Sequence, residues 1–377
     1  MARTNLKGLS IQELQSFVES LGEKKYRAAQ LYSWMYAKSA QSFEEMTDVS
    51  KSFRLVLRDV ASIDNLMLVT TKRSTDGTTK FLFKLTDGLA IESVLIVPDK
   101  KSPTADTRLT LCVSTQVGCP LDCKFCATGT MGFTRNLSSG EIIDQVLQVQ
   151  RQINRRITNL VYMGMGEPML NYDNVMRSVD IINDDNSLNI GSRHITISTA
   201  GYADKIRQMA DENRKSKLAL SLHSLDNARR TLLMPITKKF SVQELVEALE
   251  YYYRKTQQRP TFEYILFDGF NDTEADVKKF IQLSKRIPCK VNIIPFHSIE
   301  FTHPKGMAAT LKPTPKQRVE EFAERLRKSD ITVMIRTSSG EDIQAACGQL
   351  AAEEGGSARA ETGSTYHVQT NSSGVVS

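Results

Sequence analysis

Apolar residues in the first 62 positions recur at helical spacing and predict a small helical unit. Leu14 to Leu21 carry one such stripe, behind the capping-box pair Ser10 and Glu13. The segments KKYRAAQLYSWMYAK and SKSFRLVLRDVA predict a second and a third amphipathic helix. Basic and aromatic residues mix in this unit. On these residues alone, a packed bundle with solvated lysines explains the mixture better than an RNA-binding surface does.

The pattern changes to strands between Asn65 and Pro98. The segments NLMLVTTKR, TKFLFKL and LAIESVLIV alternate or run apolar, and the dipeptides Asp76-Gly77 and Asp87-Gly88 predict hairpin turns. The polar segment PDKKSPTADTR ends this piece of the chain. We therefore expect a β extension and linker over residues 63–104.

Between residues 105 and 350, strand patterns alternate with amphipathic helix patterns. The expected strands are RLTLCVST, NLVYMGM, HITIST, KLALSLH, TFEYILF, KVNIIPF and ITVMIR. The expected helices cover residues 139–154, behind a capping box at Ser138 and Glu141, and regions near 172–184, 202–213, 241–256, 273–286 and 315–329. This alternation predicts an α/β fold whose parallel sheet curls into a partial barrel of the (β/α)6 type. Ligand-binding residues of such folds gather at the carboxyl ends of the strands.

Composition excludes some classes of protein. The 40% hydrophobic and 24% charged residues are ordinary for a globular protein. The apolar runs are too short to cross a bilayer and the N-terminus lacks the apolar stretch of a signal peptide, so we expect a cytoplasmic protein without membrane contact. The net charge of +6 fits an anionic partner without identifying one. Residues 351–377 are rich in Gly, Ser, Thr and Glu and are expected to be disordered.

Cys119, Cys123 and Cys126 form the motif C-x3-C-x2-C in a polar loop after the first expected barrel strand. Disulfides are not expected in a reducing compartment, and no residue of comparable spacing supplies the fourth ligand of a structural zinc site. A 4Fe–4S cluster held by three cysteines leaves one iron open to bind the amino and carboxylate groups of S-adenosylmethionine (SAM), a known source of radicals. The spacing, with Phe125 before the last cysteine, resembles the radical SAM superfamily.

Later strand ends carry polar groups that fit the same cofactor. The segment GMGEP, with Gly166 and Glu167, resembles the glycine-rich turn at which this superfamily binds the ammonium of SAM. The next strands end on residues that can hydrogen-bond ribose or carboxylate, namely Ser198 and then Ser221, Leu222 and His223. Each is more often structural when taken alone. Their order on successive strand ends predicts a SAM site.

The segments CVSTQVGCPLDCKFCATG, GMGEP, SLH and GEDIQAACGQL together resemble the RlmN/Cfr family of radical RNA methyltransferases, over about residues 5 to 350. The likeness points to the branch that methylates C2 of adenine, with adenosine 2503 of 23S rRNA and adenosine 37 of tRNA as implied targets. It also implies one 4Fe–4S cluster, two SAM molecules per turnover, a reducing protein such as flavodoxin or ferredoxin, and RNA binding by residues 1–62. We expect a monomer.

The same resemblance implies roles for two more thiols and a carboxylate. Cys347 takes a methyl group from one SAM, the radical from a second SAM removes a hydrogen from it, and the methylene then adds to C2. Glu92 accepts the C2 proton, and Cys112 attacks the sulfur of Cys347, which leaves a disulfide. From the residues alone, a surface carboxylate on a strand is the preferred interpretation of Glu92, and Cys112 is as well explained as a buried strand thiol. The polar surroundings of Cys347 suit an exposed methyl carrier.

Several alternatives remain open at this point. A methyltransferase acting on C8 of adenine would share all these cysteines, and a non-catalytic RNA-binding protein with zinc is a hypothesis of a different class. His297 stands where the family often has asparagine after the IPF motif, and can still donate a hydrogen bond to SAM. Cys289 precedes a strand and is interpreted as a core residue.

Overall fold

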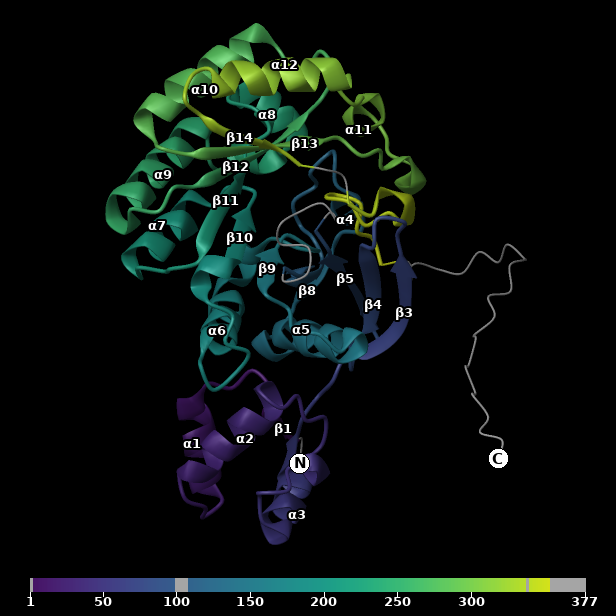
Figure 1. The fold of residues 1–377 in the computed structure, drawn as a ribbon, viewed down its shortest axis with the longest axis vertical. Coiled ribbons are helices and arrows are strands. Elements are labelled where there is room, and N and C mark those ends of the chain that lie inside the picture. The colour runs from purple at the N-terminus through teal and green to yellow at the C-terminus, as the bar shows by residue number, and fades with distance from the viewer. Residues whose placement is uncertain (1–2, 99–107, 337–338, 353–377) are drawn as a thin grey trace, which may run out of the picture.

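The computed structural model describes residues 3–98, 108–336 and 339–352, so the expected disordered tail lies outside the described residues except for its first two positions. The N-terminal unit contains β1 (Thr4–Asn5), α1 (Ile11–Ser20), α2 (Tyr26–Tyr36), α3 (Lys51–Val60) and β2 (Ala61–Ser62). The helices match the three predicted ones, and the capping box of Ser10 and Glu13 is present. In Figure 1 this unit lies at one end of the molecule, below the large sheet.

A three-stranded antiparallel extension follows the helical unit. It consists of β3 (Met67–Arg73), β4 (Thr79–Lys84) and β5 (Ala90–Ile96). Gly77 and Gly88 adopt φ of +90° and +85° in the two connections, a conformation that glycine adopts without steric cost. The predicted hairpins are therefore confirmed, and their last strand joins the main sheet through β6 (Thr110–Cys112).

Parallel strands continue the sheet from β6, and helices cover its outer face (Figure 1). The strands follow in the order β9 (Asn159–Tyr162), β10 (Ile195–Thr199), β11 (Lys217–Ser221), β12 (Thr261–Leu266), β13 (Lys290–Pro295) and β14 (Thr332–Ile335). The connecting helices are α5 (Ser139–Ile153), α6 (Tyr172–Asn183), α7 (Ala203–Asp211), α8 (Asn227–Leu233), α9 (Val242–Thr256), α10 (Glu274–Arg286), α11 (Met307–Thr310) and α12 (Lys316–Arg327). Among the described residues the sheet has ten strands with β14 and β3 at its edges, so the predicted partial barrel is confirmed.

The sequence patterns did not indicate a short hairpin around the cysteine motif. Strands β7 (Gln116–Gly118) and β8 (Phe133–Asn136) pair antiparallel and enclose the cysteine loop together with α4 (Ala127–Thr130). A Cβ on Gly118 would lie 1.9 Å from the carbonyl oxygen of Gly132, so the hairpin closes this tightly only with glycine there.

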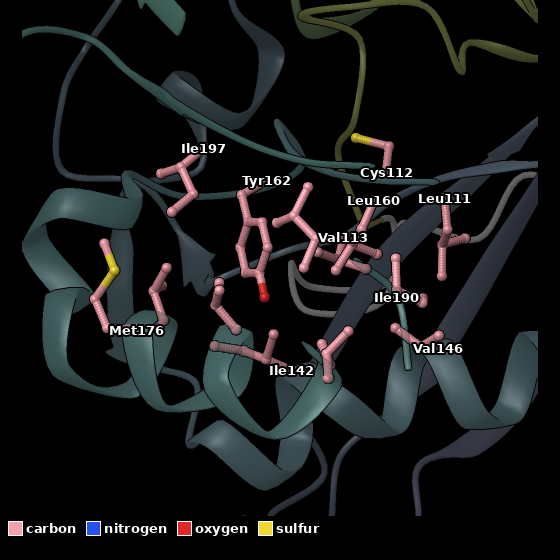
Figure 2. Packing of buried hydrophobic residues seen from close by; sticks show 14 of the residues in the cluster. Leu111, Cys112, Val113, Ile142, Val146, Leu160, Tyr162, Met176, Ile190 and Ile197 are labelled. Carbon is pink, nitrogen blue, oxygen red and sulfur yellow. The ribbon is translucent and has the colours of Figure 1, made fainter. Parts of the chain in front are cut away.

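Buried apolar residues form a core that reaches from the helical unit through both layers of the barrel. Figure 2 shows the part between the strands and α5, where Leu111 and Val113 face Ile142 and Val146. Cys289 is buried in this core, as predicted. In the part of the chain that the structure describes, no helix combines the length and apolarity needed to cross a membrane.

Candidate active site

One cavity brings together most of the residues that the sequence predicts for cofactor binding. It lies at the carboxyl ends of the parallel strands, where such folds place their ligands. Its lining includes the predicted residues Cys119, Cys123, Cys126, Gly166, Glu167, Ser198, Ser221, His223 and Cys347. Residues far apart in the sequence therefore meet at one place.

The cysteine loop is braced from two sides. The amide of Cys119 donates to the carbonyl of Gly132 in the β7–β8 hairpin at 2.7 Å, and the amide of Ala127 donates to the carbonyl of Gly348 at 2.6 Å. Burial raises the pKa of Cys119 to about 12 and that of Cys123 well above its usual range. Neutral thiols are poor metal ligands. A metal centre bound to these cysteines would stabilise their thiolate form and so lower their pKa.

The cysteines fit a cluster better than a single ion. Among the residues that the structure describes, no three His, Cys, Asp or Glu side chains converge closely enough to hold one metal ion. In an iron–sulfur cube each cysteine binds a different iron atom, so three thiols that line one cavity without meeting at a point suit this arrangement. The donor set is all sulfur, as an iron–sulfur cluster requires.

The turn after β9 presents backbone and a buried carboxyl group to the cavity. Gly166 has φ of +99°, and a Cβ there would lie 2.5 Å from Cβ of Gln116. Glu167 accepts hydrogen bonds from the amides of Met169 at 3.0 Å and Ala200 at 2.8 Å, which fix its orientation. Burial raises the pKa of Glu167 to about 7, so a cationic ligand beside it would favour its charged form.

His223 is a neutral hydrogen-bond donor toward the cavity. Its Nδ1 accepts from the amide of Ile265 at 3.0 Å, so the ring proton lies on Nε2. Burial lowers the pKa of His223 to about 3, and the ring packs edge-on against Phe125 with centroids 4.6 Å apart. Ser198 and Ser221 also line the cavity, whereas the side chain of Leu222 is fully buried in the core and is not among the lining residues that the structure describes.

Cys347 and Cys112 lie on different segments of the chain near the site. Cys347 is exposed and lines the cavity, while Cys112 is buried on β6. Figure 2 shows the sulfur of Cys112 on the opposite side of the strand from Leu111 and Val113, directed toward the yellow C-terminal segment. Burial raises the pKa of Cys112 to about 12. The pKa of Cys347 is also raised, because the surrounding cavity wall desolvates its thiol although the side chain is accessible from the cavity. The guanidinium of Arg336 acts in the opposite direction on both thiols.

Glu92 contacts the C-terminal segment and is not among the described residues that line the cavity. Its carboxylate lies 3.0 Å from Nζ of Lys80 and accepts from the amide of Ala351 at 2.9 Å. Val94 pairs with Cys112 in the antiparallel β5–β6 ladder, so Glu92 and Cys112 lie on the same face of the sheet as diagonal neighbours.

His297 does not reach the cavity within the described part of the chain. The ring is 5% exposed, and its Nδ1 lies 3.3 Å from Oε1 of Glu341 without meeting the geometry of a hydrogen bond. The expected contact of His297 with SAM therefore stays a prediction.

Two buried charged residues at the site escaped the sequence patterns. Arg230 on α8 donates to the carbonyls of Ser221 at 2.9 Å and Leu222 at 3.0 Å, and also to the carbonyl of Ala200. It thereby ties the ends of β10 and β11 together beside the cysteine loop. Glu263 on β12 lines the cavity. Its one sequence signal is a carboxylate within the otherwise apolar strand TFEYILF.

Comparison with known proteins agrees with this geometry. The family model described as "Ribosomal RNA large subunit methyltransferase N-terminal domain" matches residues 4–63, and the radical SAM superfamily model matches residues 113–282. A protein of Thermotoga sp. (strain RQ2) named "Probable dual-specificity RNA methyltransferase RlmN" is 46% identical, over 92% of this chain and 97% of that protein. A protein of the same name from Cytophaga hutchinsonii is 44% identical, over 93% of each chain.

A solved structure extends the likeness to the fold. The crystal structure of a radical SAM methyltransferase from Sphaerobacter thermophilus superposes with a TM-score of 0.84 at 38% identity, covering 93% of this chain and 100% of the other. The chain therefore belongs to the RlmN family and is an enzyme of the radical SAM methyltransferase class, which uses a 4Fe–4S cluster and SAM.

Proposed function

We propose that the protein methylates C2 of adenine in RNA, at adenosine 2503 of 23S rRNA and adenosine 37 of tRNA. Methylation through a cysteine carrier is supported by the placement of Cys347 in the cavity lined by the cysteine motif, with Cys112 directed toward the same C-terminal segment. Because a C8 enzyme would share these cysteines, the choice of C2 is supported instead by the name RlmN that the relatives carry. An SN2 methyltransferase needs no cysteine carrier, whereas an electron-poor ring carbon cannot attack the electrophilic methyl group of SAM directly. The relatives' names, which describe dual-specificity RNA methyltransferases, support RNA as the substrate class.

The residues that would hold the cofactors follow from the cavity lining. Cys119, Cys123 and Cys126 would bind the cluster, and SAM would complete it at the open iron beside Glu167, with His223 as a donor. Bound there, the two groups supply the methyl group and a 5′-deoxyadenosyl radical, with an electron from a reducing protein such as flavodoxin or ferredoxin.

The chain's own residues would carry the methyl carbon to the base. The thiolate of Cys347 accepts the methyl group, and after loss of one hydrogen the resulting methylene carbon bonds to C2. Glu92 takes the C2 proton, and the unpaired electron that remains on the adduct would return to the cluster, which supplied the first electron and would serve as its acceptor. The thiolate of Cys112 then bonds to the sulfur of Cys347, the bond between that sulfur and the methylene carbon breaks, and its electron pair stays on the carbon. A proton completes the new methyl group, and a disulfide remains to be reduced.

The base must leave its stack to reach Cys347 inside the barrel. Unpaired bases of folded RNA offer this more readily than duplexes do. The exposed face of α3 in the N-terminal unit mixes apolar with basic residues. Leu55 and Val56 are 46% and 42% exposed, and Lys51 and Arg58 of the same helix are exposed as well. We propose this unit, residues 1–62, as the RNA-binding part.

Nucleoside analysis after anaerobic incubation of the reconstituted enzyme with 23S rRNA and tRNA tests the proposal. We expect 2-methyladenosine in both RNAs, none with Cys347→Ala, and near-normal amounts with Cys289→Ala, which removes a core thiol that is not among the described lining residues of the cavity. Appearance of 8-methyladenosine instead would establish the C8 reaction and refute the proposed regiochemistry. A colourless protein with stoichiometric zinc and no cluster absorption near about 400 nm would refute the radical reaction altogether.

A further inference from the structure

Glu263 is a buried carboxylate of the cavity that the proposed chemistry leaves without a role. It is 4% exposed and lies on β12 in register with Ser221 of β11 on one side and Asn292 of β13 on the other. Its Oε1 accepts from Nδ2 of Asn292 at 2.8 Å and lies 3.6 Å from a guanidinium nitrogen of Arg336. These contacts hold the carboxylate in one orientation.

The second oxygen of this carboxylate is unsatisfied. Oε2 of Glu263 is buried and has no hydrogen-bond partner among the residues that the structure describes. An unpaired buried carboxylate oxygen is costly, and burial correspondingly raises the pKa of Glu263. Because Glu263 lines the cavity, the missing donor is best supplied by whatever binds there.

The arrangement of the cavity indicates which part of SAM supplies that donor. The amino and carboxylate groups of SAM belong at the open iron beside the cysteine loop. Apolar side chains of one cluster, Phe125, Met234, Ile265 and Ile294, also line the cavity and suit the flat adenine ring. The ribose joins these two ends of the molecule. Ser221 and Glu263, adjacent in register, are polar lining residues that can meet its hydroxyls.

The target base is a poorer partner for the same oxygen. The methylene carbon on Cys347 must contact C2, and the ring atoms beside C2 are N1 and N3, which accept hydrogen bonds and donate none. Glu263 lines the cavity with Cys347, and its charge contributes to raising the pKa of that thiol. A carboxylate facing N1 or N3 would be repelled, whereas a ribose diol offers two donors.

We propose that Glu263 accepts a hydrogen bond from a ribose hydroxyl of SAM and thereby positions the cofactor, an inference that rests on the proposed use of this cavity for SAM. Buried acidic residues bind ribose hydroxyls in the same way in dinucleotide-binding folds. Asn292 and Arg336 are positioning residues in this arrangement, because they hold Oε1 and leave Oε2 for the ligand.

Equilibrium binding of SAM and of its 2′-deoxy and 3′-deoxy analogues to the cluster-reconstituted enzyme tests this inference. Glu263→Gln keeps the size of the side chain. Because Asn292 donates to Oε1, the amide nitrogen of the variant would take the place of Oε2 and present a donor instead of an acceptor. We expect wild-type enzyme to bind one deoxy analogue about tenfold more weakly than SAM, from the usual strength of a hydrogen bond to a charged group.

Glu263→Gln should bind SAM about tenfold more weakly and should not distinguish that deoxy analogue from SAM. Glu250→Gln is the matched control and should behave as wild type. Glu250 lies on the outer helix α9, and its carboxylate pairs with Arg286. Cluster absorption equal to wild type shows that the variant is folded. If the variant still discriminates between SAM and both deoxy analogues as wild type does, Glu263 does not contact the ribose. If reconstituted wild type binds no SAM, the proposed function itself is wrong.

Discussion

A buried ion pair attaches the N-terminal unit to the barrel and permits a quantitative test. Nζ of Lys7 lies 2.7 Å from Oδ1 of Asp144 on α5, and the two side chains are 1% and 2% exposed. Lys7 also donates to Oδ1 of Asn65 at 2.6 Å, and Oδ2 of Asp144 accepts from the amide of Leu66 at 2.6 Å. A Cβ on Gly140 would lie 2.4 Å from the backbone carbonyl of Lys7, so the N-terminal segment packs directly against the first turn of α5.

Removing one charge of this pair leaves the other buried without compensation, which costs about 3–5 kcal/mol in comparable sites. We therefore expect Asp144→Asn and Lys7→Met each to lower the apparent stability of the docked unit by about this amount. The double variant removes both charges, so it should lose roughly as much as one single variant rather than the sum.

Tryptophan fluorescence during urea unfolding reports on this unit selectively, because Trp34 in α2 is the single tryptophan of the chain. The indole donates to Asp48 at 2.6 Å within the same unit, so its emission changes when the unit unfolds. Lys25→Met is the matched control, since its pairing with Glu19 at 3.6 Å is exposed and should contribute about 0.5 kcal/mol or less. Additive losses in the double variant, or single losses below about 1 kcal/mol, would show that Lys7 and Asp144 do not compensate each other's buried charge.

Three further predictions concern the site. Gly166→Ala should abolish SAM binding, measured by equilibrium dialysis, because its Cβ would lie 2.5 Å from Gln116 at φ of +99°; unchanged binding would contradict the tight turn. Cys112→Ala should accumulate RNA joined to Cys347, detected on denaturing gels, and release of product at the normal rate would exclude a resolving role. The pKa of His223 is lowered to about 3 from the ordinary value of 6.5, so between these two pH values the unfolded state binds more protons than the folded state. Cluster-free protein should therefore lose stability as the pH falls through that range. This contribution to the slope reaches about 1.4 kcal/mol per pH unit, and the slope measured for His223→Asn, whose side chain tolerates the φ of +53°, should be smaller by that amount; equal slopes would refute the assignment.

The alternation of strands and helices could be predicted because each element carries its own local signal. The capping boxes of Ser10 and Ser138 begin α1 and α5 as the sequence indicates, and Asp-Gly dipeptides mark both hairpins of the extension. The cysteine motif was equally local, since three thiols within one loop reach a common cavity whatever the rest of the fold does.

The parts that could not be predicted depend on contacts between distant segments. Arg230 satisfies carbonyls at the ends of two strands, and nothing near it in the sequence indicates such partners. Two features distinguish Glu263 from a structural carboxylate. Asn292 donates a hydrogen bond to its Oε1, and its Oε2 has no partner among the described residues at the cavity. The strands of the β7–β8 hairpin are three and four residues long, which is too short for an alternation of apolar and polar residues to be recognised.

The directions of side chains also decided which predicted residues reach the cavity. Leu222 lies between two lining residues, yet its side chain enters the core, because it follows Ser221 at the end of β11, where neighbouring positions point to opposite faces of the sheet. The same alternation separates Cys112 from Leu111 and Val113 in Figure 2 and directs its sulfur toward the C-terminal segment.

The central claim is that one iron of the cluster has no protein ligand and binds SAM. Electron–nuclear double resonance on the reduced, reconstituted enzyme tests it most directly, with SAM labelled with nitrogen-15 in its amino group. We expect a hyperfine coupling of the label to the cluster, together with a change of the cluster's electron paramagnetic resonance spectrum when SAM is added. An unchanged spectrum without coupling, as expected if Cys347 or another side chain occupied the fourth iron, would contradict the account.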